Sequence, residues 1–154
     1  MEKETLVLSR LAEQFPGLGA EKAKVTPRRI FVDVPGGIFM DVLRFAAGEL
    51  GFSHLCTITG LDTGTDFEFL YHIANTDGIL LNLTCKASKE NPVIPSVLPV
   101  YPGATFYERE LEGLLGVKVS GLPEGRQYPL PDNWPQGQYP LRKDWTPGER
   151  KIEE

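Results

Sequence analysis

The sequence contains, at residues 67–86, the segment FEFLYHIANTDGILLNLTCK. Every second side chain of residues 67–73 is large and apolar, and the alternation returns in residues 79–86. A period of two predicts strands that are buried on one face. The residues between the two runs, Asn75-Thr76-Asp77-Gly78, favour a tight turn. This segment therefore predicts two antiparallel strands. A third strand at residues 52–59, followed by a turn at residues 60–65, extends them to a three-stranded meander.

Other apolar patterns supply the rest of the domain. Alternating runs predict two more strands, at residues 21–26 and 29–34, and helical spacing predicts helices at residues 8–15, 39–50 and 103–115. Gly51 and Gly116 are placed as helix ends. Prolines between residues 91 and 102 should interrupt any regular element there. The element order predicts an α+β fold, in which helices pack in a second layer on one face of a mixed, largely antiparallel five-stranded sheet.

The chain changes character after residue 119. The last 35 residues hold six of the 13 prolines and both tryptophans, with no sustained helical or strand period. We expect residues 1–119 to form one α+β domain, since 154 residues is an ordinary single-domain length. Residues 120–154 should form an extended, proline-rich C-terminal tail that wraps a partner and is not a domain of its own.

Charge and hydropathy exclude several classes of function. The net charge is -5, and Lys and Arg are not clustered as phosphate backbones or anionic lipids demand. Apolar stretches are too short to cross a bilayer, and the sequence opens with Glu2, Lys3 and Glu4 instead of a signal segment. We therefore expect a cytoplasmic protein that neither binds nucleic acid nor inserts into a membrane.

Few residues are candidates for chemistry. His54 and His72 have no partner at ligand spacing, Cys56 and Cys85 form no CxxC pair, and no nucleotide-binding or hydrolase motif is present. We therefore expect no catalytic, cofactor-binding or metal-binding residue, and buried free thiols. Two alternatives stay open: a small enzyme that uses one cysteine with one histidine, and a stand-alone binding module.

Two segments carry charge that a simple core does not require. In residues 107–112 three carboxylates surround Arg109, which calls for a cationic partner. In residues 140–145 Arg142 could bind Glu108, Glu110 or a carboxylate of another chain, so we expect an ionic lock that fixes the tail. The tail aromatics are expected to pack on the domain or, as is favoured, on a partner. The candidate interface residues are Glu108, Arg109, Glu110, Tyr128, Trp134, Tyr139, Pro140, Leu141, Arg142, Lys143, Asp144 and Trp145.

These segments resemble a known family, the C-type subunits of NADH:quinone oxidoreductase (complex I) and of energy-converting hydrogenases. An ERE helix, a Gly-Ile-like element, a Gly-x-Pro turn and a Pro-Leu-Arg-Lys-Asp signature carry the resemblance, here at residues 108–110, 115–117, 121–123 and 140–144. Quinone-type members usually have Gly-His-Pro-Asp-Leu-Arg-Arg where residues 121–127 read GLPEGRQ, and Asp where Gly113 stands. Residues 130–137 look more like the membrane-bound nickel–iron hydrogenase branch.

The resemblance implies a role without chemistry of its own. Such a protein binds no cofactor and braces the hydrogenase large subunit, or the complex I D-type subunit, together with a neighbouring iron–sulfur subunit. It implies a place in the soluble arm of the complex, peripheral to the inner face of the cell membrane. The C-type subunit of an NADH:quinone oxidoreductase is the alternative within the family.

Overall fold

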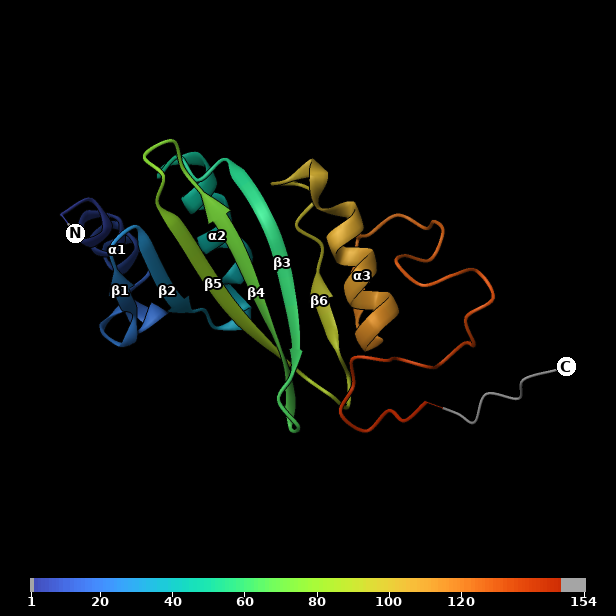
Figure 1. Ribbon diagram of the computed structural model, residues 1–154. Helices are drawn as coiled ribbons and strands as arrows, with labels where there is room; N and C mark the ends of the chain where they lie inside the picture. Colours follow the sequence, from blue (N-terminus) through green and yellow to red (C-terminus); the bar gives the residue numbers. More distant parts are fainter. Residues whose placement is uncertain (1, 148–154) are drawn as a thin grey trace, which may run out of the picture.

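The computed structural model of the chain describes residues 2–147, and Figure 1 shows its arrangement. Three α-helices are present in this part: α1 (Glu2–Gln14), α2 (Phe39–Gly48) and α3 (Thr105–Leu115). The strands are β1 (Lys24–Thr26), β2 (Arg29–Asp33), β3 (His54–Asp62), β4 (Asp66–Ala74), β5 (Leu80–Ser88), β6 (Val93–Pro95) and β7 (Lys118–Ser120).

Five strands form the main sheet in the order β1-β2-β5-β4-β3. The β3–β4, β4–β5 and β1–β2 pairs are antiparallel, while β2 runs parallel to β5. The predicted meander and the mixed, largely antiparallel five-stranded sheet are therefore confirmed. Helix α2 connects β2 to β3 at the opposite edge of the sheet, and the β3–β4–β5 meander then brings β5 beside β2.

The helices cover one face of this sheet, as the sequence predicted. Alternate β4 residues from Phe67 to Ile73 are fully buried on that face. From α2, the ring of Phe39 packs 4.7 Å from the ring of Tyr71. Helix α3 packs on β3 where Gly60 leaves room, since a Cβ at Gly60 would lie 2.6 Å from leucine side chains of α3. The opposite face holds half-buried side chains such as His72.

Several element boundaries differ from the prediction. The strand expected at residues 21–26 begins only at Lys24, after a 3-10 turn at Ala20–Lys22. Strand β3 continues through Gly60 to Asp62, where a turn was expected. The proline-rich segment does contain a strand, β6, which pairs in parallel with β7 as a second, two-stranded sheet. Its three residues are too few to show a period, and Pro95 stands at its end.

From residue 121 to residue 147 the chain has no helix or strand. This described part of the tail loops away from the domain beyond α3 and then returns to the end of α3 (Figure 1). The last residues of the predicted tail, 148–154, lie outside the described residues.

Candidate functional site

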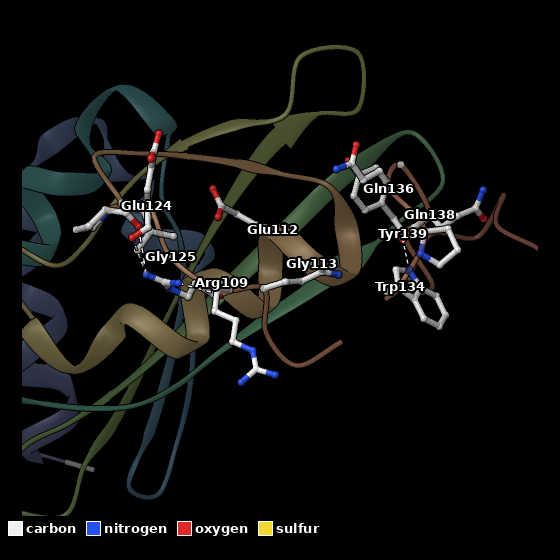
Figure 2. Close-up of a pocket in the computed structure, with 15 residues that line it drawn as sticks. Arg109, Glu112, Gly113, Glu124, Gly125, Trp134, Gln136, Gln138 and Tyr139 are labelled. Carbon is white, nitrogen blue, oxygen red and sulfur yellow. Dashed lines mark hydrogen bonds between the residues drawn. The ribbon is translucent and has the colours of Figure 1, made fainter. Parts of the chain in front are cut away.

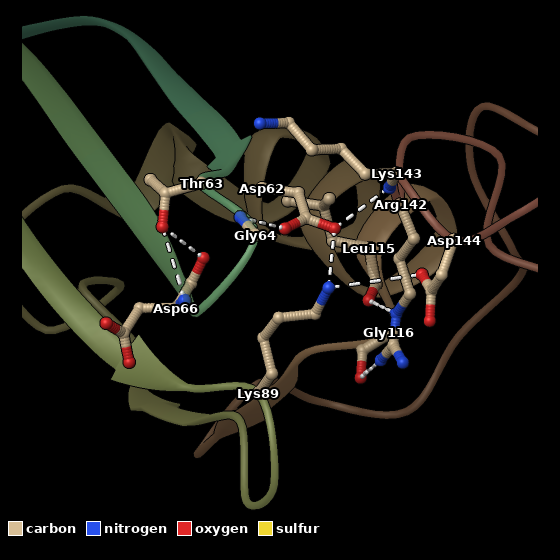
Figure 3. A network of polar contacts seen from close by, with 10 residues as sticks. All are labelled: Asp62, Thr63, Gly64, Asp66, Lys89, Leu115, Gly116, Arg142, Lys143 and Asp144. Carbon is tan, nitrogen blue, oxygen red and sulfur yellow. Dashed lines mark hydrogen bonds and ion pairs between the residues drawn. The ribbon is translucent and has the colours of Figure 1, made fainter.

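The end of helix α3 holds the tail through Arg142 (Figure 3). The Arg142 Nε–H donates to the carbonyl oxygen of Leu115 at 2.6 Å, and Nη2 donates to that of Gly116 at 3.3 Å. The last carbonyls of a helix have no partner within the helix, and a cation is favoured there by the helix dipole. The guanidinium also lies 4.7 Å from the ring centroid of Tyr139 and 5.2 Å from that of Phe67. Arg142 therefore caps α3 with a tail residue.

A second anchor forms around Asp62, at the end of β3. Its side chain is 1% exposed, and its Oδ2 accepts from Lys89 Nζ at 2.8 Å and from the Lys143 N–H at 2.9 Å. Its Oδ1 accepts from the Gly64 N–H at 2.8 Å. Burial by itself would raise the pKa of Asp62, but these hydrogen bonds and the Lys89 charge lower it to about 2. The carboxylate is thus charged at neutral pH and ties the tail to the β3–β4 hairpin.

A third anchor holds the first part of the tail. The Arg109 guanidinium, on α3, donates to three backbone carbonyls: Arg126 at 2.8 Å, Pro123 at 3.3 Å and Glu124 at 3.4 Å. Gly125 lies against the same guanidinium and leaves no room for a Cβ. The loop at residues 122–127 is therefore folded around one side chain of α3.

Glu108 points the opposite way, into the domain. It is fully buried, and its carboxylate accepts from the Ser96 hydroxyl at 2.8 Å and from the Val97 N–H at 2.6 Å. Burial raises the pKa of Glu108, and the nearby Glu112 charge adds to the effect. This carboxylate joins α3 to the segment after β6.

The ionic lock expected from the sequence is wrong in its internal pairings. Arg142 binds helix carbonyls, Glu108 is occupied inside the domain, and no ion pair joins Arg142 to Glu110 within residues 2–147. Lys143 contributes its backbone N–H, and Asp144 lies 4.0 Å from Lys89 Nζ. The charged residues do fix the tail, but to the carbonyls of α3 and to Asp62.

The tail aromatics lie partly on the chain's own domain, the arrangement that the sequence favoured less. Tyr139 packs against Gly116, where a Cβ would collide with its ring. The Trp134 and Trp145 rings lie 6.1 Å apart, and their indole N–H groups both donate to Gln138. Two other large apolar side chains of the tail are exposed: Tyr128 at 42% and Leu141 at 52%.

Between the tail and α3 lies a hollow of about 780 Å³ (Figure 2). One wall is α3, at Arg109, Glu112 and Gly113, and the others are the tail stretches 122–127 and 134–139. The tail touches α3 at Gly113, where a Cβ would lie 2.8 Å from the Tyr128 carbonyl oxygen. The hollow lies where the stretches 122–127 and 134–139 stand away from the helix.

Of the candidate thiols and imidazoles, Cys85 and His72 lie on opposite faces of the main sheet. Cys85 is buried among the core side chains, and burial raises its pKa to about 12. His72 lies on the other face of the sheet, where its Nδ1 is 2.6 Å from Asn82 Oδ1 and its Nε2 is 3.0 Å from Thr59 Oγ1. Among the described residues, no hydrogen bond or ion pair joins either cysteine to either histidine.

Two kinds of feature are absent from the described residues. Residues 2–147 hold no group of three or more His, Cys, Asp and Glu side chains placed to bind a metal ion. No helix in this part of the chain is both long and apolar enough to span a bilayer.

Sequence reasoning missed Asp62, Lys89 and Ser96. Asp62 stood in a predicted turn, and its partner Lys143 is 81 positions away in the sequence. Ser96 directly follows β6 and meets Glu108, which lies 12 positions further along the chain. The one available signal was the Gly- and Asp-rich composition of residues 60–66, which favours a polar turn but does not identify a partner.

Fold and site together define a class: a two-layer α+β domain whose C-terminal arm is anchored on the end of its last helix. Residues 32–151 match the family described as respiratory-chain NADH dehydrogenase, 30 kDa subunit, and the chain belongs to this family. The predicted resemblance is thereby confirmed.

Relatives come from several kinds of complex. The chain is 35% identical over 142 residues to the C subunit of the F420H2 dehydrogenase of Methanosarcina mazei, a match covering 88% of this chain and 89% of the relative. It is 29% identical over 143 residues to the beta subunit of the membrane-bound hydrogenase of Pyrococcus furiosus, covering 89% and 83%. A solved archaeal respiratory membrane complex, the membrane-bound sulfane sulfur reductase, contains a similar chain with a TM-score of 0.82 and 27% identity, covering 94% and 86%. The homologues are thus subunits of membrane-associated oxidoreductase complexes.

Proposed function

We propose that the chain is a non-catalytic structural subunit of a membrane-bound, energy-converting nickel–iron hydrogenase. In this proposal it sits in the soluble arm, peripheral to the cytoplasmic face of the membrane, and binds no cofactor. Its tail braces the large subunit and the adjacent iron–sulfur subunit. The similarity to the beta subunit of a membrane-bound hydrogenase supports the choice of complex.

One observation carries the proposal: the tail is held in a fixed position, yet two of its large apolar side chains, Tyr128 and Leu141, are left exposed. Arg142, Asp62 and Arg109 tie the described tail to the domain at three places. Nevertheless Leu141 is 52% exposed, and Phe106 and Tyr128 form an exposed ring pair with centroids 5.2 Å apart. Covering these groups with a partner would remove apolar surface from water, which is favourable. Exposed aromatic side chains on an ordered backbone suit a protein interface.

The experiment is affinity purification of the tagged chain from solubilised native membranes, with subunit identification by mass spectrometry and nickel analysis. We expect co-purification of a nickel-containing large subunit and an iron–sulfur subunit. Leu141→Asp is the test variant, and Leu61→Asp, at a 46% exposed site on β3, is the matched control. The proposal predicts that only Leu141→Asp reduces recovery of the partners. Recovery of the wild-type chain without any partner subunit from solubilised native membranes would contradict the proposal.

A second candidate function is that of the C-type subunit in a complex I-like dehydrogenase. The 35% identity to a subunit of an F420H2 dehydrogenase favours it. The same purification distinguishes the two, because this alternative predicts partners without nickel and with the subunits of an electron-input dehydrogenase module.

A further inference from the structure

A second, smaller hollow lies between the edge of the main sheet and helix α3, and we call it the edge hollow. Its volume is about 200 Å³. Strand β3 is the last strand of the sheet on this side and pairs only with β4. The edge hollow is lined by residues 57–60 of β3, by Glu110, Leu111, Leu114 and Leu115 of α3, and by Leu141 of the tail. The domain and the tail thus form its walls together.

The strand side of the edge hollow presents main-chain groups. Side chains of residues 57–60 point alternately to the two faces of the sheet, so a hollow that touches all four lies along the edge of the strand. Residues of an antiparallel strand bond the partner strand alternately, and the Thr63 N–H donates to the Asp66 carbonyl oxygen at 2.9 Å. By this alternation Ile58 and Gly60 direct their N–H and C=O groups away from β4. Outside the β3–β4 ladder, no hydrogen bond within residues 2–147 reaches the main chain of residues 57–60, so carbonyl acceptors are free at this edge.

The helix side of the edge hollow carries one carboxylate without a partner. Three carboxylates of this helix were expected to call for a cation. Glu108 is bonded inside the domain, and Glu112 accepts from the Val119 N–H at 3.1 Å. Arg109 is directed to the carbonyls of the tail. Glu110 is half-buried, and its side chain has no hydrogen bond or ion pair within residues 2–147. A carboxylate that is partly removed from water among leucines gains from an opposite charge.

This lining matches a long cationic side chain. The leucines would pack along its aliphatic stem, while its charged head would reach Glu110 and the free carbonyl oxygens. Arginine fits better than lysine, because the guanidinium has five donors in one plane and can bond a carboxylate and carbonyls at once. The chain already uses this chemistry, since Arg142 and Arg109 both donate to carbonyl oxygens. A divalent metal ion would require several oxygen ligands with more charge than one carboxylate supplies.

We propose that the edge hollow receives an arginine side chain of a partner subunit, with Glu110 as its counter-ion. The inference rests on the proposed function and deepens it, because it identifies a contact residue and the chemistry of the partner that meets it. Leu141 is 52% exposed, lines the edge hollow and belongs to the proposed interface. The arginine therefore enters where the partner is already expected to lie, and the chain's net charge of -5 favours its approach.

The test compares Glu110→Gln with Glu13→Gln, which removes the same charge from an exposed site on α1 outside the edge hollow. Each tagged variant is co-expressed with the wild-type chain, and mass spectrometry measures the ratio of the two in the complex purified from native membranes. We expect Glu110→Gln to be incorporated about tenfold less than wild type, which corresponds to about 1.4 kcal/mol of lost binding. Glu13→Gln should compete equally. Both isolated variants should keep the wild-type melting temperature, because neither carboxylate has a partner within residues 2–147.

A second measurement identifies the arginine on the partner. A benzophenone amino acid at Leu141 should crosslink to one partner segment in the purified complex, and mass spectrometry should find an arginine in that segment. Replacing this arginine with alanine should weaken incorporation about as much as Glu110→Gln does. The two changes together should weaken it no further than either change alone, since they remove the same contact.

The outcomes separate this inference from the proposed function. Normal incorporation of Glu110→Gln, while Leu141→Asp still loses the partners, would overturn the arginine contact and leave the proposed function standing. A crosslinked segment without arginine, or losses that add in the double variant, would also overturn it. A lower melting temperature of isolated Glu110→Gln would contradict it as well, because Glu110 would then be paired within its own chain. Failure of the wild-type chain to recover any partner would count against both.

Discussion

Replacing Asp62 with Asn should destabilise the chain by an amount that depends on pH in a defined way. In the folded state the pKa of Asp62 lies at about 2 instead of the usual 3.8. A pKa change of one corresponds to about 1.4 kcal/mol, so with some allowance for solvent screening this carboxylate contributes about 2 kcal/mol at neutral pH. The Asp62→Asn side chain would keep its shape but lose the charge that Lys89 and the Lys143 N–H face.

The sign of this pH dependence follows from the lowered pKa of Asp62 in the folded state. A folded-state pKa below the unfolded value means that the contribution is complete above about pH 4 and is lost as the pH falls through the folded value. The difference in unfolding free energy between wild type and Asp62→Asn should therefore be constant from about pH 5 to 7, roughly half as large at pH 3, and small near pH 2.

Urea unfolding followed by tryptophan fluorescence measures this difference, because Trp134 and Trp145 both lie in the anchored tail. The melting temperature at pH 7 should fall by about 4–8 °C. The control is Asp77→Asn: Asp77 pairs with Lys3 at 2.6 Å, but the two side chains are 49% and 68% exposed, so the expected loss is below about 1 kcal/mol. An equal loss in both variants, or a difference that does not shrink between pH 5 and pH 3, would refute the reasoning.

Three further predictions concern α3 and its contacts. Gly116→Ala should destabilise the chain by more than about 1 kcal/mol, because Gly116 has φ +68° and faces Tyr139, whereas Gly48→Ala, with nothing near its Cβ, should be neutral or stabilising in thermal melts. Arg142→Lys should keep the charge but lose the paired bonds to the carbonyls of α3. The loosened tail should then be cleaved faster by trypsin after Lys143, and an unchanged cleavage rate would contradict the capping role. Glu108→Gln should lower the free energy of unfolding in urea at pH 7 by less than Glu108→Ala, because Gln can still bond Ser96 and Val97. Burial raises the pKa of Glu108, so the wild type should lose stability relative to Glu108→Gln as the pH rises above the ordinary glutamate pKa.

The sequence predicts those parts of the fold that are encoded by neighbouring residues. Strands β4 and β5 and the helix ending at Gly116 follow from periods of two and 3.6 and from one glycine with positive φ. The pairing of β6 with β7 could not be predicted, because three residues at 93–95 meet three at 118–120 and neither run is long enough to show a pattern. Such contacts depend on how the whole chain folds.

The candidate site shows the same limit more sharply. Sequence reasoning selected Arg142 as a residue that fixes the tail, but assigned it carboxylate partners. Its actual partners are backbone carbonyls of Leu115 and Gly116, and every residue type carries a carbonyl, so no side-chain pattern can reveal them. Asp62, which does act as a carboxylate anchor, is brought near Lys143 only by the β3–β4 hairpin.

Helix α3 links the domain to the tail because its faces serve different partners. Leu111 and Leu115 pack on the sheet, and Glu108 holds the segment after β6. One position further along, Arg109 binds the tail, and the carbonyls at the end of the helix bind Arg142. A shift of α3 on the sheet would therefore move at least two tail anchors together.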